Sequence, residues 1–295
     1  MVYVNGNATV SIDDNGRRVV EWPDGEDLRL EYPLSIDLNI SNRCSNGCTY
    51  CYAGNTPTGR VADFLTMNYL DDMLAGSEIA INIQYPLPEN FEFWLEKMKK
   101  QGVIVNATIN QLDFERDEAI IDQVADWQDR GLLHGIGISY RSNNYIYDKI
   151  GKLKNVVIHM IVGIHTLEEI RAMLLNYNVL VLGYKFKERG ITYSQMNQFV
   201  SSSIEMLKLR ADELLKSVGR GVLCFDTKAV EQLELKNHLS EEDWNTYYQG
   251  DEGTISFYID GVKGTFNTDS HTNDEPIPID GMCIKDMFRV IREKV

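Results

Sequence analysis

An alternation of short apolar strands with amphipathic helices over residues 34–215 constrains the fold of this chain more than any other feature. Six times in succession, a strand-like run is followed by a helix-like run. Repeated units of this kind predict parallel strands joined by right-handed crossovers. The expected strands are 34–40, 78–85, 103–110, 133–140, 155–164 and 179–186, and the expected helices are 66–75, 90–102, 114–131, 143–153, 166–177 and 194–215.

The number of these units indicates the fold class. Six units predict an α/β fold, a partial (β/α)6 barrel of parallel strands, because a full eight-stranded barrel usually takes about 250 residues for its core alone. Ligands of such folds bind beyond the C-terminal ends of the strands. Functional residues are therefore expected where each strand ends.

Residues 1–33 differ from the barrel pattern and predict an N-terminal β-meander. Apolar residues alternate with polar ones over 8–13 and 17–22, and the Asn15-Gly16 pair between these runs is typical of a hairpin turn. A third short strand is expected over 28–32. We expect this meander to cover one end or edge of the barrel.

Residues 216–295 predict a C-terminal α+β extension that closes the barrel. A short strand includes Cys224, Ser240 has the position of a helix N-cap, and residues 254–266 form a hairpin with an Asp260-Gly261 turn. A polar loop then leads to a terminal helix. The predicted domains are thus 1–33, 34–215 and 216–295.

Composition narrows the class of protein and of partner. The 295 residues include 29 Lys+Arg and 44 Asp+Glu, for a net charge of −15. Because binding to duplex nucleic acid depends on Lys and Arg, this balance argues against a duplex partner. No run approaches the roughly 18 apolar residues of a membrane helix, and the N-terminus has no signal-peptide pattern. We therefore expect a cytoplasmic protein with no membrane contact.

The five cysteines are unevenly distributed. Cys44, Cys48 and Cys51 lie close together, directly after the first strand of the barrel series, whereas Cys224 and Cys283 stand alone. Three thiolates at this spacing can hold three corners of a cubane iron–sulfur cluster and leave the fourth iron open. The alternative is a structural zinc site, although such sites normally have four protein ligands.

The CxxxCxxC motif, with Tyr50 directly before its third cysteine, resembles the radical S-adenosylmethionine superfamily. The resemblance implies a [4Fe–4S] cluster on Cys44, Cys48 and Cys51, bound S-adenosylmethionine, and reductive cleavage to methionine and a 5′-deoxyadenosyl radical. It also implies an electron donor such as flavodoxin or ferredoxin. The substrate is expected to be a small molecule, a nucleotide or a short peptide. The alternative function is a non-catalytic protein that uses the cysteines structurally.

The same resemblance suggests residues that bind S-adenosylmethionine. Tyr50 belongs to the cysteine motif itself. The family's Gly-Gly-Glu-Pro-like motif after the second strand is altered here, and only Pro86 matches, so Gln84 is expected to offer the acceptor for the amino group. Arg141, after the fourth strand, is expected to bind the carboxylate, because a guanidinium matches a carboxylate bidentately.

Three further residues are expected to bind S-adenosylmethionine. Asn110 ends the third strand and shares one face with Asn106 and Thr108, which suggests a polar surface inside the barrel. By the resemblance, Ser139 offers a hydroxyl to the ribose, and Gly163 allows the adenine to approach the backbone closely.

The two lone cysteines cannot build a further four-ligand cluster, so a single cluster is expected. Cys224 is expected to be a buried structural residue, and its alternative role is hydrogen-atom donation to a substrate radical. Cys283 is expected to be structural. His271 and Asp274 lie in the polar C-terminal loop and are expected to be solvated, with substrate contact as the alternative. This tail loosely resembles those of phage-borne radical enzymes.

Alternation within the fifth and sixth strands yields further expectations. Tyr184 and Phe186 share a face and are expected to line the barrel interior, so Lys185 and Lys187 are expected to point to solvent. His159 lies in the middle of the fifth strand, where an interior histidine without a catalytic role is the favoured interpretation.

Overall fold

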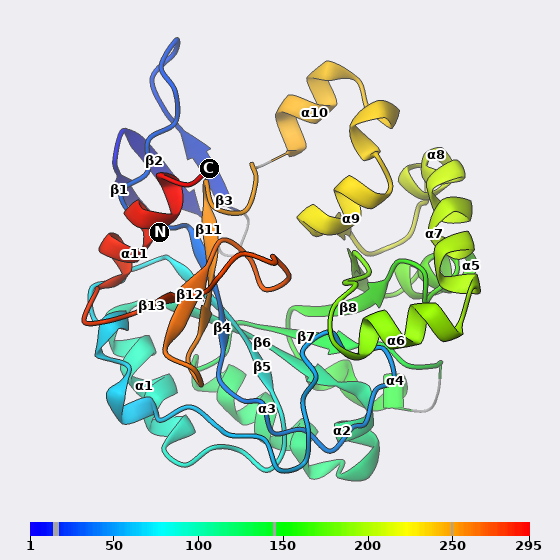
Figure 1. Cartoon of the computed structure of the whole chain (residues 1–295), viewed down its shortest axis with the longest axis horizontal. Coiled ribbons are helices and arrows are strands. Elements are labelled where there is room, and N and C mark those ends of the chain that lie inside the picture. The colour runs from blue at the N-terminus through cyan, green and yellow to red at the C-terminus, as the bar shows by residue number, and fades with distance from the viewer. Residues whose placement is uncertain (14–17, 144–145, 249) are drawn as a thin grey trace.

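The computed structural model describes residues 1–13, 18–143, 146–248 and 250–295 and contains a strongly curved sheet with helices on its outer face (Figure 1). The strands of this sheet are β4 (Ser35–Asn39), β5 (Glu78–Ile83), β6 (Ile104–Asn110), β7 (Gly135–Ser139), β8 (Val156–Ile161), β9 (Asn178–Leu182), β10 (Leu223–Phe225), β11 (Ser256–Asp260), β12 (Thr265–Asn267) and β13 (Ile277–Pro278). Their order is β10-β9-β8-β7-β6-β5-β4-β11-β12-β13. Neighbours from β10 through β11 are parallel, which confirms the predicted α/β class.

The helices are α1 (Phe91–Gln101), α2 (Gln111–Arg116), α3 (Ala119–Asp129), α4 (Ile146–Lys149), α5 (Leu167–Leu174), α6 (Arg189–Met196), α7 (Phe199–Leu209), α8 (Ala211–Leu215), α9 (Thr227–Gln232), α10 (Glu241–Tyr247) and α11 (Ile284–Arg292). Helices such as α1, α3 and α5 cover the convex side of the sheet because each presents an apolar face to it, whereas α10 buries no residue. In α1, for example, Trp94, Leu95 and Met98 are buried. No helix among the described residues is both long and apolar enough to cross a membrane.

The predicted helix over 66–75 is absent, and two short 3-10 turns, η1 (Phe64–Thr66) and η2 (Asn68–Leu70), stand in its place. The buried residues here, Met67, Leu70 and Met73, are spaced by three. This spacing suits the three-residue turn of a 3-10 helix better than the 3.6-residue turn of an α-helix. The prediction was wrong because the apolar period was taken as α-helical.

Two long predicted helices are divided. Residues 114–131 lie in α2 and α3, which are separated at Asp117, whose side chain accepts from the backbone N–H of Ala119. Residues 194–215 lie in α6, α7 and α8, with breaks at Asn197 and Arg210. Asn197 leaves helical geometry at φ −127° and donates its side-chain amide to the carbonyl of Tyr193.

The N-terminal residues form a separate antiparallel sheet of β1 (Val2–Asn5), β2 (Ala8–Ile12) and β3 (Arg18–Glu21). The antiparallel pairing of β2 with β3 was predicted, but the Asn15-Gly16 turn lies outside the described residues. The third strand is β1 and not the predicted 28–32. That segment instead gives the backbone N–H groups of Glu31 and Tyr32 to the Asn5 side chain.

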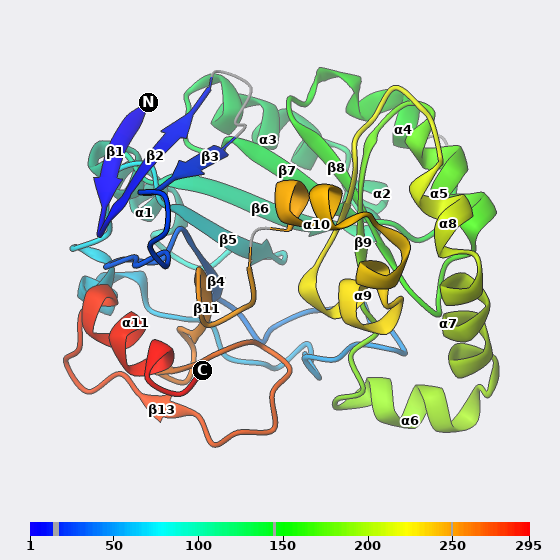
Figure 2. The ribbon, with the colours of Figure 1, turned by 90° about the horizontal axis from the view of Figure 1, so that it is seen from above.

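The C-terminal residues extend the barrel sheet at both ends of its parallel part. β10 pairs with β9, and β11 pairs in parallel with β4, while β11 and β12 form the predicted hairpin. The chain between β10 and β11 therefore passes from one side of the sheet to the other, and α9 and α10 lie between β11 and β9 in the view from above (Figure 2). Strand pairing over this sequence distance was not predicted.

Candidate functional site

The cysteine loop, residues 41–62, follows the C-terminal end of β4. Cys44, Cys48 and Cys51 are free thiols with partly exposed side chains. The backbone N–H of Cys44 donates to Thr56 (2.9 Å) and that of Cys51 to Cys48 (3.3 Å). Gly47 turns the chain at φ +63°, a conformation that favours glycine, and no atom lies within 4 Å of where a Cβ would stand. The loop is thus folded tightly beside open space.

The spacing of the three sulfur atoms discriminates between metal groups. Among the described residues, the only set of three or more potential ligand atoms within 4.8 Å of one another is that of Glu252, Asp269 and His271, so the cysteine sulfurs are more widely spread. A tetrahedral zinc ion with bonds of 2.3 Å holds its sulfurs about 3.8 Å apart. A cubane, whose thiolates bind different irons, needs a wider spread. As placed, the three sulfurs therefore do not form a closed zinc site.

Two arginines from distant segments hold this loop. Arg189, the first residue of α6, donates from Nε to the carbonyl of Cys48 (3.1 Å) and from Nη1 to that of Asn55 (2.9 Å). Arg116 of α2 donates to Asn46 Oδ1 (2.5 Å). Sequence reasoning missed both arginines, since nothing local distinguishes a loop-binding arginine from a surface one.

Three of the predicted cosubstrate residues meet beside Cys48. Arg141 Nη1 donates to the Tyr50 hydroxyl (2.9 Å), and Asn110 Nδ2 lies 3.7 Å from Cys48 Sγ. Asn110 Oδ1 accepts from the backbone N–H of Leu112 and so caps α2. Burial raises the pKa of the Cys48 thiol, while the charge of Arg141 opposes this rise. Binding of S-adenosylmethionine by Tyr50, Asn110 and Arg141 remains a prediction.

Gln84 directly follows β5, and Ser139 is the last residue of β7. With its amide oriented to satisfy both ends, Gln84 donates to the Ser41 hydroxyl (3.2 Å) and accepts from Asn55 Nδ2 (3.2 Å). Its side chain therefore joins Ser41, the first residue of the cysteine loop, to Asn55 in the second half of the loop. Ser139 pairs in register with Asn110 of β6 and with His159 of β8, so it lies at the mouth of the barrel.

Gly163 is a glycine for a reason other than the predicted one. Its φ of +81° disfavours other residues, and a Cβ there would come within 2.9 Å of Ile204 and 3.2 Å of Val200, both on α7. Helix packing and backbone conformation therefore account for this glycine. Contact with adenine remains a prediction.

Lys185 points into the barrel, which corrects the prediction that it points to solvent. Its Nζ donates to Ser270 Oγ (3.0 Å) and lies 4.5 Å from the centroid of the Tyr52 ring. Burial lowers its pKa, but the surrounding negative groups, among them Asp226 and Asp37, outweigh burial and raise it. The prediction failed because β9 ends at Leu182, so strand alternation no longer applies.

The neighbours of Lys185 differ from the prediction for the same reason. Lys187 Nζ donates to the carbonyls of Ser270 (3.3 Å) and Thr272 (3.4 Å) and so faces the C-terminal loop. Tyr184 is buried, with its hydroxyl bound to the Gly190 carbonyl (2.7 Å), while Phe186 is 50% exposed. Phe186 therefore does not line the barrel interior.

Asp37, Asp226 and Glu252 are electrostatic neighbours of Lys185, and Asp269 is a neighbour of Glu252. We call these four carboxylates the acidic wall. Burial and then the charge of Asp37 raise the pKa of Glu252 to about 8. Burial likewise raises the pKa of Asp37. Within the described residues, the side chains of Asp37 and Glu252 have no hydrogen bond or ion pair. When all four are ionised, the acidic wall thus carries more negative charge than the ammonium of Lys185 compensates.

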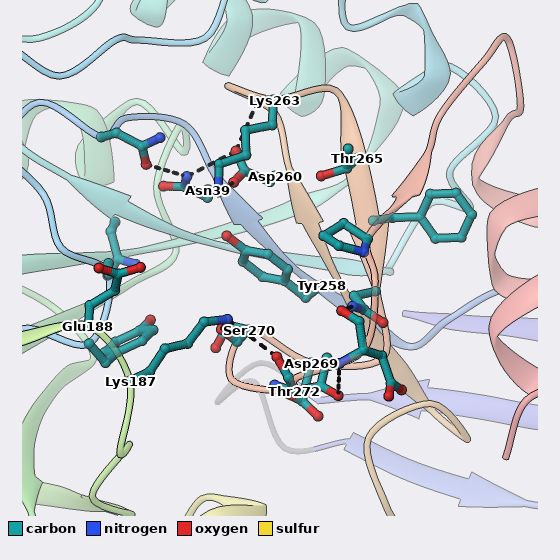
Figure 3. Close-up of a pocket in the computed structure, with 18 of the residues that line it drawn as sticks. Asn39, Lys187, Glu188, Tyr258, Asp260, Lys263, Thr265, Asp269, Ser270 and Thr272 are labelled. Carbon is teal, nitrogen blue, oxygen red and sulfur yellow. Dashed lines mark hydrogen bonds and ion pairs between the residues drawn. The ribbon is translucent and has the colours of Figure 1, made fainter. Parts of the chain in front are cut away.

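A cavity of about 140 Å³ lies between the cysteine loop, the β11–β12 hairpin and the C-terminal loop 267–276 (Figure 3). Asp260 accepts from Asn39 Nδ2 (3.2 Å) and pairs with Lys263 (3.2 Å) on one side of it. Tyr52 comes from the cysteine loop, and Asp269 comes from the C-terminal loop. The cavity therefore joins the cysteine loop to the acidic wall.

The remaining predicted residues are placed as follows. Cys224 is exposed, which corrects the expectation of a buried cysteine, and it pairs in register with Leu180 of β9. Cys283 precedes α11, and its Sγ lies 3.3 Å from Asp286 Oδ2. Burial lowers the pKa of His159 to about 4, and its ring occupies the space beside Gly137.

No family model and no curated protein sequence matches this chain. Among solved structures, SuiB of Streptococcus suis is 11% identical over 88% of this chain and 66% of that chain, with a TM-score of 0.51. SuiB bound to S-adenosylmethionine is 10% identical over 93% of this chain and 72% of that chain, with a TM-score of 0.48. A tryptophan synthase α-subunit of Pyrococcus furiosus has a TM-score of only 0.35 at 9% identity, over 73% of this chain and 95% of that chain. The likeness to SuiB shows a shared fold.

Proposed function

We propose that this chain is a radical S-adenosylmethionine enzyme. The observation that carries the proposal is the position of three free thiols in one loop at the C-terminal end of β4, with spacing wider than one zinc ion needs. When bound there, a [4Fe–4S] cluster supplies the electron that cleaves S-adenosylmethionine to methionine and a 5′-deoxyadenosyl radical. The fold shared with SuiB, which has been solved with S-adenosylmethionine, supports the proposal.

The surrounding residues have roles that follow from their contacts. Cys44, Cys48 and Cys51 would each hold one iron. Asn110 Nδ2 can donate to the Cys48 sulfur, and such hydrogen bonds raise the reduction potential of a cluster. Arg141 uses Nη1 on Tyr50, which leaves its other N–H groups for the carboxylate of S-adenosylmethionine. Gln84 holds the loop, so the amino group would depend mainly on the open iron.

The substrate would occupy the cavity between the cysteine loop and the acidic wall. Its lining is mainly polar, with amide, hydroxyl and charged groups from Asn82, Tyr258 and Asp260. Such a lining suits a polar small molecule, a nucleotide or a short peptide. We further propose that the protein is cytoplasmic and takes its electron from a flavodoxin or a ferredoxin.

The decisive experiment measures 5′-deoxyadenosine. Protein reconstituted anaerobically should hold about four irons per chain, and dithionite with S-adenosylmethionine should yield 5′-deoxyadenosine. Alanine variants at Cys44, Cys48 and Cys51 should lose the iron and the formation of 5′-deoxyadenosine. Cys283→Ala, the same substitution at a cysteine outside the loop, should keep the iron and form the product. A fully loaded protein that never forms 5′-deoxyadenosine would refute the catalytic proposal.

The second candidate is a non-catalytic protein that uses the cysteines structurally. The engagement of Gln84 within the cysteine loop favours it, because that side chain is not free to bind the methionine amino group. Metal analysis of the aerobically purified protein separates the two functions. One zinc per chain and no absorbance near 400 nm would support the second candidate.

A further inference from the structure

Three potential metal ligands meet beside the cavity, and one of them, Asp269, lines it. Glu252 precedes β11, and Asp269 and His271 belong to the loop after β12. One ligand atom from each lies within 4.8 Å of the other two. Adjacent donors on an octahedral ion with bonds near 2.1 Å are about 3 Å apart. Modest side-chain movement would therefore bring all three onto one ion.

His271 adds an observation independent of the carboxylates. Its Nδ1 atom is inaccessible to solvent and makes no hydrogen bond of acceptable geometry, although it lies 2.9 Å from Asp269 Oδ1. A buried imidazole nitrogen without a hydrogen bond is costly. Asp269 Oδ1 pairs with this nitrogen at 2.9 Å and also accepts from the backbone N–H groups of His271 (2.6 Å) and Thr272 (2.5 Å). The 2.9 Å separation also suits two adjacent ligands on one metal ion, which would satisfy the nitrogen.

Charge around the three residues favours a divalent cation. Asp37, Asp226 and Asp269 are electrostatic neighbours of Glu252, and Lys185 lies among them. A second ammonium, that of Lys187, binds the carbonyls of Ser270 and Thr272 beside His271. Four carboxylates against two ammonium groups leave an excess of two negative charges when all are ionised. Glu252 has no ion-pair or hydrogen-bond partner within the described residues, so its charge is available to a bound ion.

We propose that Glu252, Asp269 and His271 bind one divalent transition-metal ion at the edge of the cavity, apart from the cysteine site. One imidazole and two carboxylates form a mixed nitrogen–oxygen donor set, which suits Mn²⁺ or Fe²⁺ better than thiol-preferring ions. Asp269 also lines the cavity, so the ion would lie at its edge (Figure 3). This site does not depend on the proposed radical chemistry.

Manganese provides a selective probe, because Mn²⁺ prefers oxygen and nitrogen over thiolate ligands. Titration of the full-length protein, followed by the electron paramagnetic resonance signal of free Mn²⁺, should show one ion bound per chain with a dissociation constant below about 100 µM. Glu252→Gln and His271→Gln should each weaken binding at least tenfold. Glu275→Gln, an exposed carboxylate in the same loop, should bind like the unmodified protein. Cys48→Ala should also bind normally, which separates this site from the cysteine loop.

Thermal unfolding of each variant shows whether it is folded, and Glu252→Gln is the decisive change because that side chain holds no other described group. Absence of saturable Mn²⁺ binding up to 1 mM in the unmodified protein would overturn the proposal. So would unchanged affinity in folded Glu252→Gln and His271→Gln, or an equal loss in Glu275→Gln. Loss of Mn²⁺ binding in Cys48→Ala would assign the ion to the cysteine loop and overturn it as well.

Discussion

The cysteine loop and the acidic wall border the same cavity, yet they are built with opposite charge. Arg116, Arg141 and Arg189 surround the cysteine loop. The acidic wall has Lys185 as its compensating cation and leaves Asp37 and Glu252 without hydrogen-bond or ion-pair partners among the described residues. Cationic donors stabilise thiolates and an anionic cluster, whereas uncompensated carboxylates attract cations. The comparison indicates two adjacent sites for ligands of opposite charge.

The largest expected effect tests whether the two regions are independent. Cys48→Ala should lose most of its iron, because a second iron of the cubane then has no protein ligand. Glu252→Gln should keep the same iron content and the same absorbance near 400 nm as the unmodified protein. Iron analysis of both variants after anaerobic reconstitution provides the measurement. Equal loss of iron in the two variants would show that the acidic wall contributes to the cluster.

The second prediction concerns the arginine that holds the cysteine loop. Arg189→Met removes two charge-assisted hydrogen bonds to the carbonyls of Cys48 and Asn55. Each such bond contributes about 1.5–3 kcal/mol, and partial compensation by water leaves an expected loss of about 3 kcal/mol in the free energy of unfolding. Cluster loss on dilution into chelator should also be faster.

Arg60→Met is the matched control, because Arg60 is an exposed arginine of the same loop. Arg189→Lys should restore part of the stability, since an ammonium can reach only one of the two carbonyls well. If Arg189→Met and Arg60→Met had the same chelation rate, the arginine would not hold the loop.

The third prediction uses the titration of the acidic wall. Burial and Asp37 raise the pKa of folded Glu252 to about 8 from its ordinary 4.5. Between these values the folded protein binds a proton that the unfolded chain does not, so stability decreases as pH rises towards 8. Between pH 6 and pH 8, the free energy of unfolding of the unmodified protein should therefore decrease by about 2 kcal/mol more than that of Glu252→Gln. The upper limit for one titrating group is about 1.4 kcal/mol per pH unit.

Denaturant unfolding at several pH values measures this difference. Addition of 1 mM Mn²⁺ should reduce the pH dependence of the unmodified protein, because a bound cation favours ionised Glu252. The variant should show no such change. Parallel pH profiles for the two proteins would mean that Glu252 titrates normally.

The smallest expected effect sharpens the charge comparison at Lys185. Lys185→Met removes the ammonium beside Asp37, Asp226 and Glu252. A like charge about 8 Å from a divalent ion opposes its binding by about 1 kcal/mol in the high effective dielectric of an open cavity. Affinity for Mn²⁺ should therefore rise about fivefold, while Lys216→Met, a change at an exposed lysine, should leave it unaltered. Weaker binding in folded Lys185→Met would show that the lysine organises the site.

The parallel sheet and the position of the cysteine loop were determined by local patterns. From Leu34 into β4, Leu34, Ile36 and Leu38 alternate with Ser35 and Asp37, and this period of two also places Asp37 on the inner face. The same pattern in β6 places Asn106, Thr108 and Asn110 on the inner face. Asp37 was overlooked although the alternation marks it as clearly as it marks Asn110.

Local patterns failed where an element ended early or changed period. The end of β9 at Leu182 reversed the expected directions of Lys185 and Phe186. The three-residue spacing of Met67 and Leu70 formed 3-10 turns in place of a helix. In each case the local residues allowed two conformations with similar propensities, and packing against the rest of the chain selected one.

By itself, the sequence determined the strand–helix alternation, the inner faces of the strands and the short spacing of Cys44, Cys48 and Cys51. These features depend on residues within a few positions of one another. Only the tertiary structure decided that Arg189 binds the carbonyl of Cys48, 141 residues away, and that Lys185 meets Ser270, 85 residues away. Such contacts result from the packing of distant segments around the barrel, and no local propensity or periodicity specifies which distant charge will meet them.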